Sequence, residues 1–197
     1  MYQLVLASAS PRRRQLLKDA GFSCLVHPSQ ISEKLQEKLN IDDQLRDLAR
    51  RKAEAVYQDY IKIHKDPFIV LGADTEVIVH GEALGKPADE RQAIAFLKLL
   101  SGCFHEVKTA VHIIESTKQE SVSLLETTLI EFYELTDQQI LDYVKTGEPF
   151  DKAGGYAIQG LGSKLVRRTS GSWTNVVGLP VEKVVETFKA KGWKVHP

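Results

Sequence analysis

LVLASASPRRR, residues 4–14, joins an apolar run of strand length to the start of a helix. Ser10 is a favoured residue at a helix N-cap, and Pro11 at the first helical position lacks only an amide that would have no partner there. Gly21 is the next residue that typically ends a helix. The stretch therefore predicts a strand that leads directly into a helix ending near Gly21.

Three arginines, Arg12, Arg13 and Arg14, occupy the first turn of this predicted helix. Cations at a helix N-terminus oppose the helix dipole, at a cost of roughly a few tenths of a kcal/mol. A bound anion would reverse this effect, because free amides, hydroxyls and guanidinium groups would all point at it. Taken alone, the stretch is equally consistent with a basic surface patch on a frayed helix. The rest of the chain favours a phosphate site.

The remaining chain alternates in part between predicted helices and strands. Helices are predicted at residues 42–64, 89–100 and 136–147 and from 180 onward; strands are predicted at residues 22–28, 68–72, 75–79, 104–114, 121–135 and 164–168. Two long consecutive strands favour a mixed sheet. We therefore expect a single domain over residues 1–197, of α/β or α+β class, with a curved mixed β-sheet and flanking helices.

The composition is that of an ordinary globular protein, with 43% hydrophobic and 26% charged residues. A formal net charge of zero gives no global attraction to nucleic-acid polymers or anionic membranes, although a local cluster could still bind a small charged ligand. Cys24 and Cys103 form no C-x-x-C pair, and the histidines lack zinc-site spacing. With no leader-like segment and no apolar run of membrane-spanning length, we expect a cytoplasmic protein.

Lys52 lies on the apolar stripe of the predicted helix over residues 42–64, close to Ala49 and Val56. A lysine on such a stripe commonly reaches solvent along its stem. A buried ammonium instead needs a partner, and a phosphate oxygen would serve. Both interpretations stay open on the pattern alone.

Asp74 follows a continuous apolar run, which predicts a carboxylate at the C-terminal end of a buried strand. Such a position suits chemistry, because the sheet holds the side chain next to a crevice. The alternative is a turn residue that hydrogen-bonds its own backbone. Lys86 precedes Pro87 and is expected in extended backbone.

The segment over residues 151–162 is rich in glycine but lacks both the P-loop and the Rossmann patterns. Its glycines could bring backbone close to a ligand, with Gln159 offering an amide to a base, or they could simply form tight turns. Ser8 has no nucleophile-elbow context, so a phosphate-binding hydroxyl is its better role.

Taken together, these segments resemble the Maf family of nucleoside triphosphate pyrophosphatases. The matching pieces are SASPRR (8–13), Glu33, ARRKA (49–53), GADT (72–75), GKP (85–87), DKAGGYAIQG (151–160) and VGLP (177–180). They occur in the family's order over essentially the whole chain. The loop departs from the family at GGYA, where GAYG is expected.

The resemblance implies two lobes around a deep cleft, related to the inosine triphosphate pyrophosphatases, together with a homodimer and a divalent cation, Mg²⁺ or Mn²⁺. It implies hydrolysis of a nucleoside triphosphate between the α- and β-phosphates. By resemblance, Asp74 is the catalytic base and Glu33 and Asp74 are metal-linked carboxylates. The implied phosphate-binding residues are Ser8, Arg13, Lys52 and Lys86.

Within the family, Arg12, Thr75 and Gln159 match the subgroup that acts on dTTP and UTP; modified pyrimidine nucleotides are further candidate substrates. The 7-methyl-GTP subgroup usually has Trp, Gln and Glu at these positions. Two alternatives stay open: a non-catalytic nucleotide-binding regulator of cell division or septum formation, and a phosphatase that releases orthophosphate. The products distinguish all three.

Overall fold

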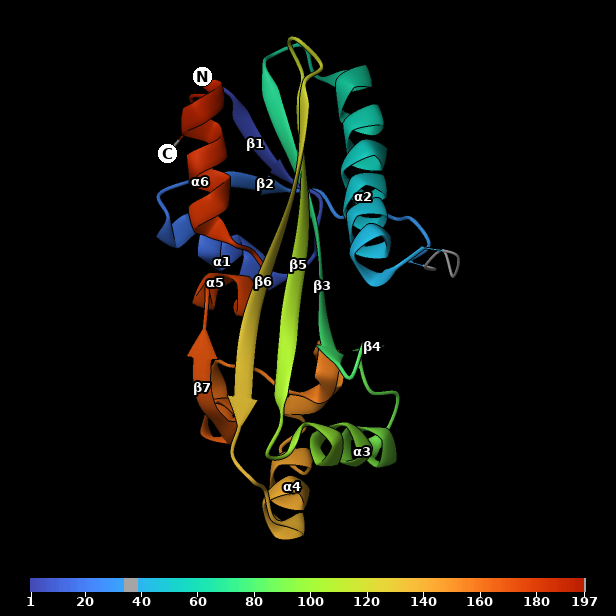
Figure 1. Cartoon of the computed structure of the whole chain (residues 1–197). Coiled ribbons are helices and arrows are strands. Elements are labelled where there is room, and N and C mark those ends of the chain that lie inside the picture. The colour runs from blue at the N-terminus through green and yellow to red at the C-terminus, as the bar shows by residue number, and fades with distance from the viewer. Residues whose placement is uncertain (34–38, 197) are drawn as a thin grey trace. The chain divides into compact units, whose positions relative to one another are not determined.

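The computed structural model describes residues 1–33 and 39–196, and the strands in them form a seven-stranded mixed sheet (Figure 1). The strand order is β2-β1-β3-β5-β6-β7, with β4 paired to β3. Strand β1 is parallel to β2 and β3, whereas β4 and β7 are antiparallel to their neighbours. Helices flank this sheet, so the predicted α/β class with a mixed sheet is confirmed.

Internal contacts divide the chain into two compact units. Unit 1 comprises Met1–Asp74, Thr109–Glu126 and Gly178–Pro197, and unit 2 comprises Thr75–Lys108 and Thr127–Val177. Each unit holds one free, partly exposed cysteine: Cys24 in unit 1 and Cys103 in unit 2. The expectation of one domain over residues 1–197 stays a prediction.

Unit 1 has a parallel strand core covered by helices. Its elements are β1 (Gln3–Leu6), α1 (Pro11–Asp19), β2 (Cys24–Val26), α2 (Ile41–Ile63) and α6 (Val181–Lys191), with parts of β3 (Phe68–Val79), β5 (Phe104–Glu115) and β6 (Ser121–Phe132). In Figure 1, α2 lies on one side of β1, and α1 and α6 lie on the other. Apolar residues of β1, β3 and α2, including Val5, Val70 and Val56, form one buried cluster.

Unit 2 holds the remaining parts of β3, β5 and β6 and the shorter elements. These are β4 (Glu82–Leu84), α3 (Glu90–Leu100), α4 (Asp137–Val144), the 3₁₀ turns η1 (Glu148–Asp151), η2 (Ala153–Gly155) and η3 (Gly160–Leu165), β7 (Val166–Ser170) and α5 (Trp173–Val177). Its own buried cluster includes Leu97, Phe132, Ile140 and Tyr156. The predicted glycine-rich loop is thus a series of 3₁₀ turns.

The predicted helix starts are confirmed by their caps. The Ser10 side chain accepts from the Arg13 amide with Pro11 at the first helical position, and Thr136 and Gln139 form a complete capping box. Such caps are encoded within four residues, which is why the sequence reveals them.

Asp74 was expected at the end of a strand, and this expectation is wrong. The two predicted strands at 68–72 and 75–79 are one strand, β3, and Asp74 lies inside it. The polar residues after Asp74 do not end the strand, because Val77, Ile78 and Val79 continue the ladder by pairing with β4. Residues 121–135 also end as a strand earlier than predicted, at Phe132, and α5 was not predicted.

In the part of the chain that the structure describes, no helix combines the length and apolar character needed to cross a membrane.

Candidate active site

A buried arginine organises the start of α1 in unit 1. Arg13 is only 9% exposed, and its guanidinium donates to the Ser8 hydroxyl at 3.0 Å, the Ala73 carbonyl at 2.9 Å and the Gly178 carbonyl at 2.8 Å. Ser8 also accepts from the Ser10 amide at 3.2 Å. Arg13 therefore fixes three segments of unit 1 around the residue that precedes Asp74.

Burial is the largest influence on the Arg13 guanidinium and lowers its pKa, while the negative charge of Asp74 opposes this shift. A buried guanidinium is costly unless its donors are paired, and here two backbone carbonyls and the Ser8 hydroxyl accept from it. Arg13 thus has a structural role, because its hydrogen bonds join the segments that contain Ser8, Ala73 and Gly178. Its predicted contact with phosphate is an additional role that stays a prediction.

Helix α2 and strand β3 approach each other unusually closely at Gly72. A Cβ atom at Gly72 would lie 2.5 Å from the Ala49 carbonyl oxygen and 2.7 Å from the Ala53 amide nitrogen. No side chain fits in this space, so glycine allows the helix backbone to touch the strand. Lys52 lies on that helical turn, and Asp74 lies two residues along the strand.

Lys52 and Asp74 form a buried ion pair. The Lys52 Nζ lies 2.7 Å from Asp74 Oδ1, and the two residues are 6% and 8% exposed. The same ammonium lies 2.8 Å from Glu33 Oε1, whose side chain is 63% exposed. The helix stripe thus carries Lys52 inward rather than to solvent, and Lys52 gathers two of the predicted carboxylates.

One oxygen of this cluster lacks a hydrogen-bond partner among the residues that the structure describes. Asp74 Oδ2 is buried and unpaired within the described part of the chain. Buried carboxylate oxygens nearly always have a partner, so an exception calls for an explanation such as a ligand, a water molecule or a metal ion.

The oxygen donors at this cluster suit a hard cation. The Asp74 and Glu33 carboxylates both contact the Lys52 ammonium and therefore lie close together. Carboxylate oxygens are preferred ligands of Mg²⁺ and Mn²⁺. Among the described residues no group of three or more acidic, histidine or cysteine side chains forms a complete metal site. A metal here would need further oxygens from a substrate or water, as is usual for Mg²⁺ bound with phosphates.

The other predicted residues are less buried. In unit 1, Arg12 is half-buried in the first turn of α1. In unit 2, Thr75 is half-buried on β3, Lys86 is exposed after β4, and Gln159 is exposed immediately before η3. The Gly154 amide donates to the Gly85 carbonyl at 3.1 Å, which joins the backbone next to Lys86 to the glycine-rich segment.

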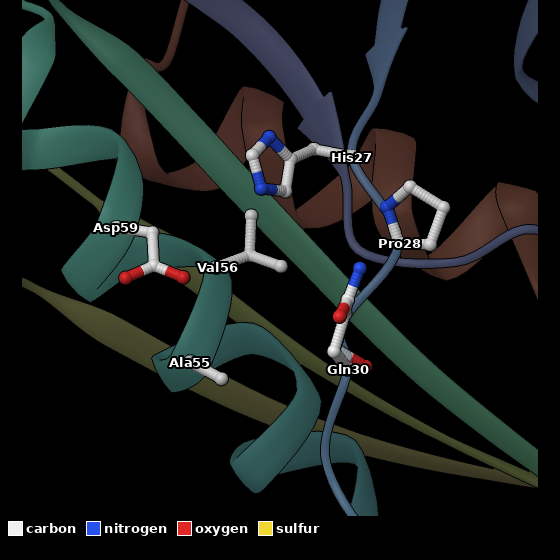
Figure 2. Close-up of a pocket in the computed structure, with 7 residues that line it drawn as sticks. His27, Pro28, Gln30, Ala55, Val56 and Asp59 are labelled. Atoms are coloured by element: carbon white, nitrogen blue, oxygen red, sulfur yellow. The ribbon is translucent and has the colours of Figure 1, made fainter.

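A separate pocket of about 190 Å³ lies in unit 1 between the segment after β2 and helix α2 (Figure 2). It is lined by His27, Pro28, Ser29, Gln30, Ala55, Val56 and Asp59. The predicted site residues do not belong to this set, and the pocket is distinct from the Lys52–Asp74 cluster.

Sequence reasoning selected Lys52, Asp74 and Glu33 separately but did not predict their contact. Gly72 was missed as the residue that permits it. Its signal was present in the sequence, since a glycine in a buried strand marks a close approach of backbone, and the small residues Ala49 and Ala53 lie one helical turn apart.

Comparison with known proteins places these residues in context. The family model of the Maf-like protein matches residues 3–191. A dTTP/UTP pyrophosphatase from Bdellovibrio bacteriovorus is 54% identical over 92% of this chain and 94% of its own length. A dTTP/UTP pyrophosphatase from Halalkalibacterium halodurans is 45% identical over the full length of both chains.

Among solved structures, a nucleoside-triphosphatase (dITP/XTP pyrophosphatase) from Mycobacterium abscessus is similar with a TM-score of 0.40 and 13% identity, covering 96% of this chain and 94% of that one. This similarity is too low to support an argument. The match over residues 3–191 and the identity to full-length relatives are sufficient: the chain belongs to the Maf family.

Proposed function

We propose that this protein hydrolyses dTTP and UTP to the nucleoside monophosphate and pyrophosphate. The observation that carries the proposal is the buried Lys52–Asp74 pair, in which one carboxylate oxygen has no partner within the described residues. The relatives of this chain are named dTTP/UTP pyrophosphatases. A carboxylate held by a rigid strand and a helix can accept a proton at a fixed position.

In the proposed reaction, one water molecule attacks in line with the phosphoanhydride bond between the α- and β-phosphates. Asp74 accepts a proton from that water, the new P–O bond forms, and the bond to the bridging oxygen breaks as pyrophosphate leaves. Lys52 orients Asp74 through its contact with Oδ1, and the proton goes to Oδ2, which has no hydrogen-bond partner among the described residues. Ser8, Arg13, Lys52 and Lys86 stabilise the charge on the phosphates.

A divalent cation, Mg²⁺ or Mn²⁺, fits this proposal. Asp74 and Glu33 would hold it, and it would supply charge stabilisation to the phosphate oxygens. The Glu33 side chain is 63% exposed and contacts Lys52 at 2.8 Å, so an arriving ion would meet this carboxylate at the protein surface.

The deciding experiment incubates the purified protein with dTTP, UTP, CTP, GTP and ATP in Mn²⁺ or Mg²⁺ and quantifies monophosphate, pyrophosphate and orthophosphate. We expect equal amounts of monophosphate and pyrophosphate from dTTP and UTP. Orthophosphate as the first product would identify a phosphatase. Nucleotide binding without any product would identify a non-catalytic regulator.

Base selection is proposed to involve Gln159, with Arg12 and Thr75. A neutral amide can donate to a uracil or thymine carbonyl and accept from the ring N–H. Gln159→Glu should therefore impair dTTP and UTP hydrolysis, because an ionised carboxylate can only accept. The measurement is kcat/KM for both substrates, with Gln138→Glu on the exposed face of α4 as the control; equal use of all five triphosphates by the native protein would contradict this assignment.

We also propose that the protein forms a homodimer, as the family resemblance implies, and that it is cytoplasmic, as expected from the sequence. Light scattering coupled to size-exclusion chromatography measures the mass of the assembly directly. A mass close to one chain of 22.1 kDa would contradict the dimer.

A further inference from the structure

Two side chains in unit 2 hold the backbone on either side of Gln159. The Tyr143 hydroxyl accepts from the Ala157 amide at 3.3 Å, two residues before Gln159. The Glu148 carboxylate accepts from the Leu161 amide at 3.1 Å, two residues after Gln159, and from the Gly162 amide at 2.9 Å.

These two side chains also bind each other. The Tyr143 hydroxyl donates to Glu148 Oε1 at 2.9 Å, so the tyrosine and the carboxylate form one unit, which we call the clamp. The clamp is itself anchored: Tyr143 is buried on α4, and the Lys152 ammonium donates to the Glu148 carbonyl at 2.7 Å. The segment is thus held at one end by a residue of α4 and at the other by a residue of η1, which restricts its backbone.

The glycines of this segment are explained by the clamp. Gly160 has a φ of +78°, and a Cβ atom there would lie 2.8 Å from Glu148 Oε2. At Gly162 a Cβ atom would lie 2.7 Å from the Tyr143 hydroxyl and 2.4 Å from the Ala157 carbonyl. Both positions therefore require glycine because the protein's own groups occupy the space.

The electrostatics favour an ionised Glu148 and a neutral Tyr143. Burial acts to raise the pKa of Glu148, but the hydrogen bonds from Gly162, Leu161 and Tyr143 outweigh it, so the net pKa is lowered. Burial and the neighbouring Glu148 charge raise the pKa of Tyr143, which keeps its hydroxyl protonated as a donor. The protonated Tyr143 hydroxyl is therefore the donor and the ionised Glu148 carboxylate the acceptor. Hydrogen bonds to an ionised acceptor are stronger than those between neutral groups.

We propose that Tyr143 and Glu148 are positioning residues for base selection: they fix the backbone at Gln159 so that its amide meets the pyrimidine edge in one orientation. This inference rests on the proposed function, because it assigns to Gln159 the role of reading the base. Neither clamp residue is proposed to touch the substrate. Their effect is therefore expected in discrimination between bases rather than in the chemical step.

The test compares UTP with CTP, which differ only at the base edge that an amide reads. Glu148→Gln places an amide where two backbone amides donate, and Tyr143→Phe removes the hydroxyl but keeps the ring in the core. In both variants we expect the ratio of kcat/KM for UTP to that for CTP to fall by about tenfold or more, mainly through KM for UTP, because misplaced polar contacts lose discrimination steeply. Glu134→Gln and Tyr133→Phe, at exposed positions near α4, are the matched controls.

Hydrogen exchange at the Leu161 and Gly162 amides supplies a readout that does not depend on activity. We expect faster exchange there in Glu148→Gln, with the rest of unit 2 still protected. A UTP-to-CTP ratio that stays unchanged while these amides lose protection would overturn the proposal, as would equal losses for both substrates. If Glu148→Gln does not fold, Tyr143→Phe alone decides. Native protein that releases no pyrophosphate from UTP refutes the proposed function instead, and with it the role of the clamp.

Discussion

Asp74 is held differently at its two carboxylate oxygens, and this difference yields a sharp test of its role. Oδ1 contacts Lys52, whereas buried Oδ2 has no partner in the described residues. Asp74→Asn keeps an oxygen for Lys52 but loses the base, so we expect turnover of UTP to fall by about 10²–10⁴-fold while the protein stays folded. Pyrophosphate release under saturating Mn²⁺ measures the effect.

The control for this variant is Asp59→Asn, an exposed position on α2. Nucleotide binding by calorimetry should survive in Asp74→Asn. Turnover close to that of the native protein would transfer the role of base to another residue, with Glu33 as the next candidate.

Arg13 is expected to matter for stability as well as for phosphate binding. Arg13→Ala removes the donors to Ser8, Ala73 and Gly178, and leaves a cavity under α1. Loss of a buried polar network typically costs about 2–4 kcal/mol, so the free energy of unfolding in urea should fall by that order. Arg14→Ala, exposed on the next position of the same helix, should cost little.

The outcome also separates the two roles of Arg13. A variant that unfolds as the native protein does, yet loses substrate affinity, would show that Arg13 acts on phosphate alone. A variant with lower stability and also lower kcat/KM would support both roles.

At the scale of elements, the close contact between α2 and β3 is possible because residue 72 is a glycine and has no side chain. In Gly72→Ala, the new methyl group would meet backbone atoms of Ala49 and Ala53, which cannot rotate away. Overpacking of this kind costs roughly 1–3 kcal/mol, and it would also move Lys52 away from Asp74. We therefore expect a lower urea midpoint together with lower kcat.

Gly85→Ala is the stability control, because a Cβ atom at Gly85 has no neighbour within 4 Å. Unchanged stability and unchanged kcat in Gly72→Ala would mean that the helix can shift without consequence for the site.

The elements were predictable where their signals are local. Two helix starts are predicted by capping residues that lie within a few positions of one another. These residues are Ser10 for α1 and the pair Thr136 and Gln139 for α4, and all three form the expected caps. Helix α5 does have a local cap, because the Ser172 hydroxyl accepts from the Asn175 amide at 3.1 Å, but its five residues are too few to show a helical period. Its Asn175 is also held by distant groups, donating to the Val107 carbonyl at 2.9 Å and to the Thr128 hydroxyl at 3.0 Å. Contacts across tens of residues leave no periodic pattern in the sequence.

The same distinction applies to the candidate site. Lys52 was recognisable as a charge on an apolar stripe, and Asp74 as a carboxylate after an apolar run. Their pairing across 22 residues depends on the helix packing at Gly72, and the position of Asp74 inside β3 depends on pairing with β4. The roles of the site residues stay predictions until the variants are measured.

At the scale of the whole molecule, Glu115 makes stability depend on pH. This fully buried carboxylate accepts from the Thr117 and Lys118 amides at the end of β5. Burial acts to raise its pKa, but these hydrogen bonds prevail and lower the pKa below the usual 4.5. A depressed pKa in the folded state means that Glu115 stabilises the protein above pH 4.5 and loses this contribution as the pH falls through its folded value.

We therefore expect Glu115→Gln to be less stable than the native protein at pH 7 by about 1–3 kcal/mol, the usual effect of losing bonds to a buried charge. The difference in the free energy of unfolding between the two proteins should become smaller as the pH is lowered below 4.5. Urea unfolding at a series of pH values measures it, and the exposed Glu82→Gln is the reference. If the difference in unfolding free energy stays constant across this pH range, ionisation of Glu115 is not the cause of the lower stability.

One free cysteine in each unit gives the protein a built-in pair of attachment points for fluorescent dyes. Burial raises the pKa of the Cys24 thiol, so maleimide labelling near neutral pH should be slow at that position and should accelerate in mildly alkaline buffer. Attaching a donor and an acceptor dye in sequence would require no engineered thiols. Single-molecule energy transfer between them could then follow the distance between the units, in real time, as nucleotide is added and consumed.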